Sequence, residues 1–490
     1  MNKVLLKDSW KYLLLLLICF PLFQYLDSWT IRLWDESRLA INAYEMFRNG
    51  NYLIPTFDNV PDMWNVKPPA MIWFQVFFMK LFGVSEMAIR LPSAFAALFT
   101  CLILLFVSVR YVKSFWLGFI CILVLVSSTG YVGYHAARTG DYDALLTLFS
   151  TSVSFSLFIY FENPEKKYLY LFFISLALAV LTKSVTILMF VPGLFIFTLI
   201  ERKFVFLLKD CHFYLGLLIF FTTAGGYYLL REIYNPGYLS AVWTNELGGR
   251  FLETIEGHQA GFWFYYQNLT GSRFEIWSFL VPCGIITGLF VKDDKIKNLT
   301  IFSTIMAVTF FLAISFSQTK LSWYDLPLFP FLAILASIFI YFIFNFSKEK
   351  LKSVRHPIFK VIPYTFLVLV FYIPYKQIIK KTYYPKGYPG EWEMEYYGAS
   401  YYLRDIINGK IEKENFAIVY DGQFTSIKFY VNLLNDRRKN ITRKNLVEIE
   451  PGDIILLSQN STMKFIEEKF DFNIIDEYYN VKLYEILEEK

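Results

Sequence analysis

Residues 88–109 read AIRLPSAFAALFTCLILLFVSV, an almost uninterrupted apolar run that carries one charge, Arg90. A helix needs about 20 mostly apolar residues to cross a membrane, so this run predicts a transmembrane helix. Comparable runs recur along the chain, and from their length we expect about 11–13 transmembrane helices. Eleven of them can be bounded, at 11–27, 88–109, 114–134, 143–161, 168–181, 185–200, 212–230, 274–291, 298–316, 324–346 and 357–375.

The continuity of these runs decides between two classes of membrane protein. Only helices and closed barrels satisfy every backbone group in lipid, and barrel strands would alternate apolar and polar residues over segments of about 10 residues. The chain of 490 residues is 56% hydrophobic and 18% charged, whereas soluble domains carry about 25% charged residues. The sequence therefore predicts a polytopic α-helical membrane protein.

The net charge and the cysteines argue against other classes. The net charge is only +5, and we attribute the basic excess to membrane topology and not to nucleic-acid binding. All five cysteines lie in or at the edges of apolar runs, which favours neither a disulfide framework nor a cysteine-based metal site.

Basic residues in short loops predict the orientation, because cytoplasmic loops are enriched in Lys and Arg. Alternate loops carry basic clusters, as at Lys166 and Lys167, and we place them and the N-terminus in the cytoplasm. The first apolar run is expected to remain as an uncleaved span. A shorter apolar segment, 69–83, predicts an interfacial or re-entrant helix. The outward segments are then 28–87, 135–142, 182–184, 231–273, 317–323 and the tail after residue 376.

The composition changes near the end of the last span, and we expect two domains, a transmembrane domain at 1–380 and an extracytoplasmic domain at 381–490. Short apolar runs bounded by turn residues predict strands in the tail, and segments of helical periodicity predict helices. The strands are expected at 415–420, 453–457 and 481–486, and the helices at 397–408, 424–434 and 462–469. This pattern predicts a small soluble α/β domain.

The first outward loop, 28–87, carries an unusual set of ionisable residues. Two adjacent carboxylates, Asp35 and Glu36, stand near Arg38, and Lys67 precedes two prolines. Ionisable groups at the end of a membrane span are functional candidates, because they are costly to desolvate. The alternative interpretation is that the two carboxylates only stabilise the N-terminus of a helix. We predict that this is the catalytic loop.

The order of several motifs resembles a known family. The motifs are Asp35-Glu36-Ser37-Arg38, Asn49 to Pro55, Lys67-Pro68-Pro69, Phe82-Gly83, Arg90-Leu91-Pro92-Ser93-Ala94, Ala137-Arg138-Thr139-Gly140 with Asp143, Leu181-Thr182-Lys183, Pro192-Gly193, and Lys320-Leu321 with Tyr324 and Pro327. In this order they resemble the bacterial lipid A aminoarabinose transferases and the related protein O-mannosyltransferases. The resemblance is collinear from about residue 30 to 335 and implies the GT-C type of fold.

The resemblance implies a glycosyltransferase with a polyprenyl-phosphate sugar as donor. Cleavage of the sugar–phosphate bond leaves a phosphate whose growing charge needs fixed cations, and Arg and Lys bind phosphate through charge-assisted hydrogen bonds. The outward residues expected to bind the donor phosphate are Arg38, Lys67, Arg90, Arg138, Lys183, Lys320 and Tyr324. For any single Lys or Arg, the alternative interpretation is that its side chain extends to the membrane interface and binds no phosphate.

Three carboxylates are candidates for the catalytic base. Asp35 is the first candidate, because a positioned carboxylate can take the proton of an acceptor hydroxyl. Glu36 and Asp143 are further candidates, and the alternative for Asp143 is a helix N-cap.

A metal site is the point at which the sequence departs from the family. The resemblance implies an acidic residue just before Lys-Pro-Pro that holds a metal together with a histidine of the long outward loop. Here that position is Val66, while His258 lies in loop 231–273. One histidine alone does not make a metal site. The sequence therefore predicts no defined cofactor, and a divalent metal is the alternative. His258 is kept as a candidate for binding the sugar or a metal.

Taken together, the sequence predicts a multi-pass glycosyltransferase of the bacterial inner membrane. It would transfer a sugar from polyprenyl phosphate to a lipid A- or lipopolysaccharide-like glycolipid on the periplasmic face. One alternative is a protein O-mannosyltransferase that acts on Ser or Thr of exported proteins. The alternative from another class is a lipid-linked-sugar transporter or flippase, which should show inverted repeats and ionisable groups at mid-membrane.

Overall fold

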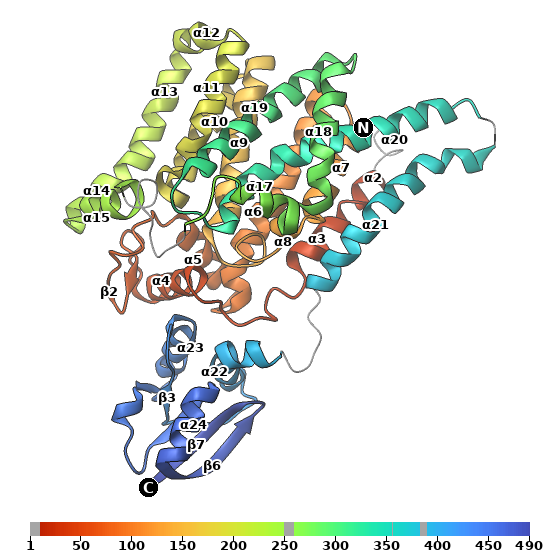
Figure 1. Ribbon diagram of the computed structural model, residues 1–490. Coiled ribbons are helices and arrows are strands. Elements are labelled where there is room, and N and C mark those ends of the chain that lie inside the picture. Colours follow the sequence, from red (N-terminus) through yellow and green to blue (C-terminus); the bar gives the residue numbers. More distant parts are fainter. Residues whose placement is uncertain (1–9, 249–258, 355, 383–389) are drawn as a thin grey trace.

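A computed structural model describes residues 10–248, 259–354, 356–382 and 390–490. A bundle of long helices forms the larger part, and a small mixed α/β unit lies against one end of it, beside α4 and α5 (Figure 1). A large hydrophobic core extends through the bundle and into the small unit. This arrangement confirms the predicted fold class.

The helices of the bundle follow the predicted spans. Among the described residues, seven helical stretches are long and apolar enough to cross a membrane, or eight if one bent pair counts as a span. Shorter apolar helices occupy 11–23, 70–82 and 115–126. The bounds are α2 (Trp10–Leu13), α3 (Leu16–Phe23), α6 (Glu86–Val107), η1 (Ser108–Val112), α7 (Phe115–Val126), α8 (Thr129–Val132), α9 (Tyr142–Glu162), α10 (Lys166–Lys183), η2 (Ser184–Phe190), α11 (Val191–Ile200), α12 (Phe204–Lys209), α13 (Cys211–Phe220), η3 (Phe221–Gly225), α14 (Gly226–Tyr234), α15 (Tyr238–Val242), η4 (Trp243–Gly248), α17 (Phe264–Asn268), η5 (Leu269–Arg273), α18 (Glu275–Phe290), α19 (Asp294–Phe316), η6 (Ser322–Leu328), α20 (Phe329–Leu351), η7 (Pro357–Lys360) and α21 (Ile362–Thr382).

The stretch from α10 to α11 is helical throughout, yet its contacts require two crossings, as the sequence predicts. Lys183 at the end of α10 pairs with Asp143 at the start of α9. Asp210, just before α13, accepts a hydrogen bond from Tyr160 near the opposite end of α9. The chain must therefore return across the bundle between residues 183 and 210, through η2 and α11.

The first outward loop folds into two helices, α4 (Asp35–Asn49) and α5 (Ala70–Phe82). Gly50 ends α4 with a φ of 70°, a conformation that glycine adopts at little cost. Pro68 and Pro69 precede α5, where a missing N–H costs nothing because the first helical donors have no partner within the helix. Between the helices, β1 (Thr56–Phe57) and β2 (Val60–Pro61) form a short antiparallel pair. The loop thus carries Asp35 on a helix start and Lys67 just before another.

The tail contains, in its described part, a five-stranded sheet of order β4-β3-β5-β7-β6. Strands β4 and β5 pair in parallel with β3, whereas β7 is antiparallel to both β5 and β6. The expected strands and helices are present, and two further strands, β4 and β6, were not predicted. The bounds are α22 (Glu391–Ile407), β3 (Ala417–Val419), α23 (Thr425–Asp436), β4 (Thr442–Lys444), η8 (Leu446–Glu448), β5 (Ile454–Leu457), α24 (Asn460–Lys469), β6 (Phe470–Tyr478) and β7 (Val481–Glu489).

The tail is docked on segment 28–87 through buried polar contacts. Tyr430 of α23 donates to Glu86 at 2.7 Å and accepts from the backbone N–H of Ile31 at 2.9 Å. Arg32 forms an ion pair with Glu393 of α22 at 2.7 Å, with both side chains buried. The helices α22 and α23 therefore contact the chain both before Asp35 and Glu36, at Ile31 and Arg32, and after them, at Glu86.

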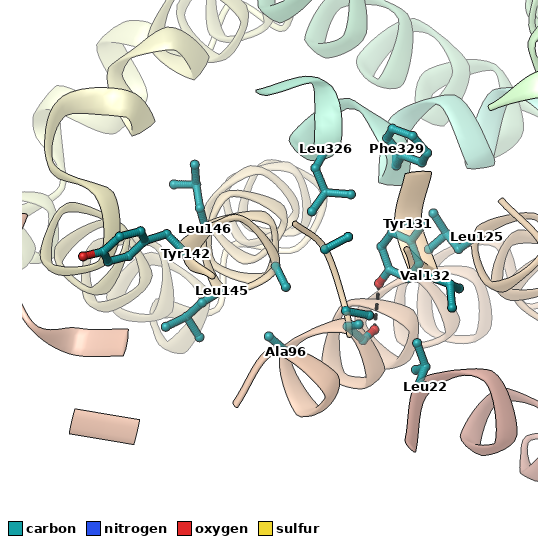
Figure 2. Close-up of a cluster of buried hydrophobic side chains, with 14 of the residues drawn as sticks. Leu22, Ala96, Leu125, Tyr131, Val132, Tyr142, Leu145, Leu146, Leu326 and Phe329 are labelled. Atoms are coloured by element: carbon teal, nitrogen blue, oxygen red, sulfur yellow. Dashed lines mark hydrogen bonds between the residues drawn. The ribbon is translucent and has the colours of Figure 1, made fainter. Parts of the chain in front are cut away.

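Behind the loop that joins α8 to α9 lies a dense apolar cluster (Figure 2). Tyr131 stacks on Phe329 with ring centroids 6.5 Å apart, and its hydroxyl donates to the carbonyl of Ala97 at 2.7 Å. Leu145 and Leu146 of α9 lie on the side of Tyr142 in the same view. Because packed cores deform little, this cluster gives residues 133–141 a rigid base.

Candidate active site

The buried carboxylate of Glu36 is bound on both oxygens. Arg90 donates to Oε1 at 2.7 Å and to Oε2 at 2.9 Å, and the backbone N–H groups of Arg32 and Gly140 each donate at 2.8 Å. Burial raises the pKa of Glu36, but the charge and hydrogen bonds of Arg90 lower it by more, so the pKa lies below its usual range. Glu36 is held as a structural anion and has little freedom to act as a base.

Arg90 is likewise occupied. A guanidinium has five N–H donors, and those that Glu36 does not take point to backbone carbonyls. The acceptors are Leu26 at 2.7 Å, Trp29 at 2.8 Å and Thr30 at 2.8 Å. Every donor of Arg90 is therefore used within the protein, which leaves none for a phosphate.

Gly140 is close to this pair for a steric reason. A Cβ on Gly140 would lie 2.5 Å from Cγ2 of Ile89 and 2.9 Å from its carbonyl oxygen. Only glycine permits this approach, which places the Gly140 N–H on Glu36. The glycine of the Ala137–Gly140 motif thus joins the second outward loop to the first.

A cavity of about 490 Å³ gathers two of the predicted phosphate-binding lysines. Lys183 forms an ion pair with Asp143 at 2.6 Å, and its ammonium lies 4.6 Å from the ring centroid of Tyr324. Lys67 pairs with Glu246 at 3.2 Å. All five side chains line the cavity, together with apolar residues such as Leu146, Leu188, Met189, Phe310 and Ile314. Two lysine ammonium groups and an apolar surface therefore line the same cavity.

The remaining predicted cations lie elsewhere. Arg38 makes a bidentate pair with Asp62, at 2.8 and 2.7 Å. The charge and hydrogen bonds of Arg38 more than offset the effect of burial, so the pKa of Asp62 lies below its usual range. Lys320 donates to the carbonyl of Ser317 at 2.6 Å, and burial lowers its pKa. The structure does not bring Arg38 or Lys320 into contact with Lys67 and Lys183.

Arg138 lines a second, larger cavity of about 1050 Å³ between the bundle and the tail. It donates to the carbonyls of Pro21 and Tyr25, and burial together with the like charge of Arg90 lowers its pKa to about 10. The cavity is rich in aromatic rings from both parts of the chain, namely Trp29, Trp34, Tyr134, Trp323, Trp392 and Tyr396. It offers a wide, partly apolar surface with cations at its edge.

Asp35, on the first turn of α4, is less buried than Glu36. A ligand atom of its carboxylate lies within 4.8 Å of atoms of His135 and Asp141. Burial lowers the pKa of His135, but Asp141, then Asp35 and Asp143, raise it by more. Of the two adjacent carboxylates, Glu36 is thus the one that Arg90 binds, whereas Asp35 lies near His135 and Asp141.

Several residues of the site were not predicted. His135 and Asp141 are both buried, as is Arg231, which donates to the carbonyl of Asp62 at 2.9 Å. The spacing of Asp141 two residues before Asp143 is a signal that the sequence contains. Glu246 carries no such local signal, because it pairs with Lys67, which is distant in sequence. Arg231 combines a distant partner, the carbonyl of Asp62, with local contacts to Tyr227 and Tyr238.

The metal site that the family resemblance implies does not fit these residues. Val66 is fully buried in an apolar cluster with Tyr238 and Val242, and a valine offers no ligand. His258 lies outside the described residues.

Comparisons with known proteins indicate a family for part of the chain. Residues 66–225 match the family described as dolichyl-phosphate-mannose-protein mannosyltransferase. An uncharacterized protein of Aquifex aeolicus is 26% identical over 71% of this chain and 66% of its own length. The undecaprenyl phosphate-alpha-4-amino-4-deoxy-L-arabinose arabinosyl transferase of Aeromonas salmonicida is 28% identical over 64% of this chain and 57% of its own length. The chain thus spans less than two thirds of the length of these relatives.

The fold also matches a solved structure. The crystal structure of ArnT from Cupriavidus metallidurans bound to undecaprenyl phosphate superposes with a TM-score of 0.71, at 15% identity, and covers 97% of this chain and 98% of that one. At this identity the match concerns the fold, and it extends over both the bundle and the tail.

Proposed function

We propose that the chain is a glycosyltransferase of the GT-C type, related to the aminoarabinose transferases and protein mannosyltransferases, and that it transfers a sugar from a polyprenyl-phosphate donor. The single observation that carries this proposal is the cavity in which Lys67 and Lys183 lie beside an apolar wall. A lipid-linked donor combines an anionic phosphate with a hydrocarbon chain, and this cavity offers a matching surface to each.

The ion pairs with Glu246 and Asp143 hold Lys67 and Lys183 in the cavity. An ammonium has three N–H donors, so each lysine can donate to an entering phosphate while it keeps its carboxylate partner. When the sugar–phosphate bond breaks, the growing negative charge meets cations that are already in place, which is the main requirement of electrostatic catalysis.

We place the acceptor in the cavity of about 1050 Å³, which is lined by residues of both the bundle and the tail. Aromatic rings and the Arg138 guanidinium suit an amphipathic acceptor with anionic groups, and we therefore favour a glycolipid of the lipid A or lipopolysaccharide type. The reaction takes place on the periplasmic face of the bacterial inner membrane, with the N-terminus cytoplasmic. Asp35 takes the proton of the acceptor hydroxyl as it attacks, and this single displacement inverts the anomeric centre.

The test is transfer by the purified, full-length protein. We expect a radiolabelled sugar to move from undecaprenyl phosphate to a lipid-extractable product with an inverted anomeric configuration. Label in protein Ser or Thr residues would instead support the protein O-mannosyltransferase alternative. Label that crosses a vesicle membrane without formation of a new glycosidic bond would indicate a flippase and would overturn the proposed function. Retention of the anomeric configuration in the product would overturn the single-displacement mechanism.

Replacing Lys67 tests the donor cavity directly. We expect Lys67→Met to weaken binding of undecaprenyl phosphate on the order of 10–100-fold, because a hydrogen bond between charged groups contributes about 1.5–3 kcal/mol. Equilibrium binding by native mass spectrometry in detergent measures this change.

The matched control is Lys80→Met. Lys80 lies on the same helix-loop segment, at the exposed end of α5, where it donates to the Tyr52 hydroxyl. We expect this variant to bind the lipid as the wild type does. Equal weakening in both variants would mean that general positive charge, and not the cavity, attracts the lipid.

A further inference from the structure

The strand order of the tail reverses in its parallel part. From β3 the chain passes through α23 to β4 on one side, and it then crosses to β5 on the other side of β3. Because β3 and β5 are parallel neighbours, their carboxyl ends meet at one edge of the sheet. In open α/β sheets, ligands bind outside the carboxyl ends of the strands where the strand order reverses. The tail therefore has an edge of the kind at which such sheets bind ligands.

The two loops at this edge are bound to each other. β3 ends at Val419, and Gly422 in the following loop has a φ of 110°, a conformation that favours glycine. β5 ends at Leu457, and the side chain of Gln459 just beyond it accepts from the N–H of Asp421 at 2.7 Å and donates to its carbonyl at 2.8 Å. This contact uses only the backbone of Asp421, so it fixes the loop without occupying the carboxylate.

The same edge of the tail faces the larger cavity. Figure 1 shows α22 and α23 on the side of the tail that lies toward the bundle. Asp421, Gly422 and Gln423 line the cavity of about 1050 Å³, together with Trp392 and Tyr396 of α22. The strand order and the cavity lining thus identify the same loop independently of each other.

The tail side of the cavity combines aromatic rings with hydrogen-bonding groups. The rings of Trp392 and Tyr396 have centroids 5.1 Å apart, and the two residues are 65% and 40% exposed. Asp421 and Gln423 are exposed as well. A sugar ring presents C–H faces that pack on aromatic rings, and hydroxyl groups that bond to carboxylates and amides. The tail side therefore has the groups that a saccharide requires.

The bundle side of the same cavity differs in its chemistry. It contributes apolar side chains, among them Leu26, Leu33 and Ile378, and the cations Arg138 and Lys381. Apolar side chains suit the acyl chains of a glycolipid, and cations suit its anionic groups. Each part of an amphipathic acceptor thus has a matching part of the cavity, and the uncharged hydroxyl groups of the saccharide match the tail.

We propose that the tail binds the saccharide of the acceptor, through the side chains of Asp421 and Gln423 and the rings of Trp392 and Tyr396. The Asp421 carboxylate accepts hydrogen bonds from sugar hydroxyls, and the Gln423 amide both donates and accepts. A site that hydrogen-bonds a substrate hydroxyl discriminates against analogues that lack it, so these residues select the acceptor and take no part in the chemical step. The inference rests on the proposed placement of the acceptor in the larger cavity.

The experiment is saturation-transfer difference NMR on the purified, full-length protein in deuterated detergent, with the deacylated glucosamine disaccharide of lipid A as the probe. We expect saturation to reach the ring protons of the disaccharide, and a titration gives its dissociation constant. Asp421→Ala is expected to weaken binding on the order of 10-fold, as for loss of a hydrogen bond to a charged group. Trp392→Ala is expected to weaken it about 2–10-fold, the range for lost aromatic packing. Binding of undecaprenyl phosphate should not change in either variant.

Matched controls come from a part of the tail outside the cavity lining. Asp471 on β6 is an exposed carboxylate, and Tyr479 in the turn after β6 is an exposed aromatic residue. We expect Asp471→Ala and Tyr479→Ala to bind the disaccharide as the wild type does. Weakening in these variants equal to that in Asp421→Ala and Trp392→Ala would contradict a site at the loop after β3.

Two further results overturn the proposal. One is absence of saturation transfer from the wild-type protein to the ring protons of the disaccharide, and this measurement needs no variant to fold. The other is unchanged affinity in both Asp421→Ala and Trp392→Ala. The proposed function fails separately, because transfer of a labelled sugar from the donor tests it, whereas saccharide binding is measured without donor and without turnover.

Discussion

Asp35→Asn is expected to lower the rate of sugar transfer by about 10²–10⁴-fold, the range for loss of a general base. The substitution keeps the shape of the side chain but removes its capacity to accept a proton. The first turn of α4 should be unaffected, because Arg38 N–H bonds to the carbonyl of Trp34 independently of the Asp35 side chain. Initial rates with saturating donor and acceptor measure the effect, while donor binding should stay within a factor of about two to three, since we assign phosphate binding to Lys67 and Lys183.

The control for this variant is Asp58→Asn. Asp58 lies on the same outward loop, where it pairs with Lys428 of the tail and is largely exposed. We expect this variant to transfer sugar at the wild-type rate, because exposed ion pairs contribute little to protein stability. Full activity of Asp35→Asn would assign the base to another group, with Asp143 next in line although it is already paired with Lys183.

Glu36→Gln is expected to lower the free energy of unfolding by about 3–5 kcal/mol, because breaking a buried ion pair leaves the other charge unpaired. Arg90 would keep its carbonyl acceptors but lose the anion that balances it. The pKa of Glu36 is lower in the folded state than in the unfolded state, so the stabilisation is present above the unfolded pKa of about 4.3 and is lost as the pH falls through the folded pKa. Denaturant titration in detergent at pH 7 measures the difference.

The comparison for Glu36→Gln is Glu468→Gln. Glu468 pairs with Lys464 one helical turn away, and both side chains are mostly exposed. No measurable change in stability is expected there. Equal stability of wild type and Glu36→Gln would show that the Arg90 cluster of carbonyls suffices without the carboxylate.

The fold could be predicted largely from local patterns. Apolar runs locate the spans, and Gly50 marks the end of α4 because glycine takes the left-handed conformation easily. In the tail, β6 was missed because most of its residues are exposed or only partly buried, so no apolar alternation marks it. β4 is short, and none of its residues is buried.

The candidate site was harder to predict, because the role of a charged residue depends on its distant partners. Arg90 and Glu36 both resemble functional groups in sequence, yet 54 residues separate them and the fold joins them into a structural pair. Lys67 and Lys183 have the same residue chemistry as Arg90 but lie in a cavity. Only the three-dimensional arrangement shows that Lys67 and Lys183 line a cavity, whereas every donor of Arg90 is bound within the protein.

The docking of the tail has a consequence for module exchange between homologues. Tyr430, Glu393 and Asp436 contact Glu86, Arg32 and Tyr44 respectively, so both halves of each contact must match in a chimera. A tail grafted without these three residues would meet an unmatched surface and would open the wall that Trp392 and Tyr396 give to the larger cavity. We therefore expect a chimera to have the acceptor preference of the homologue that supplies its tail. Exchanging tails while keeping the contact residues offers a way to change the acceptor.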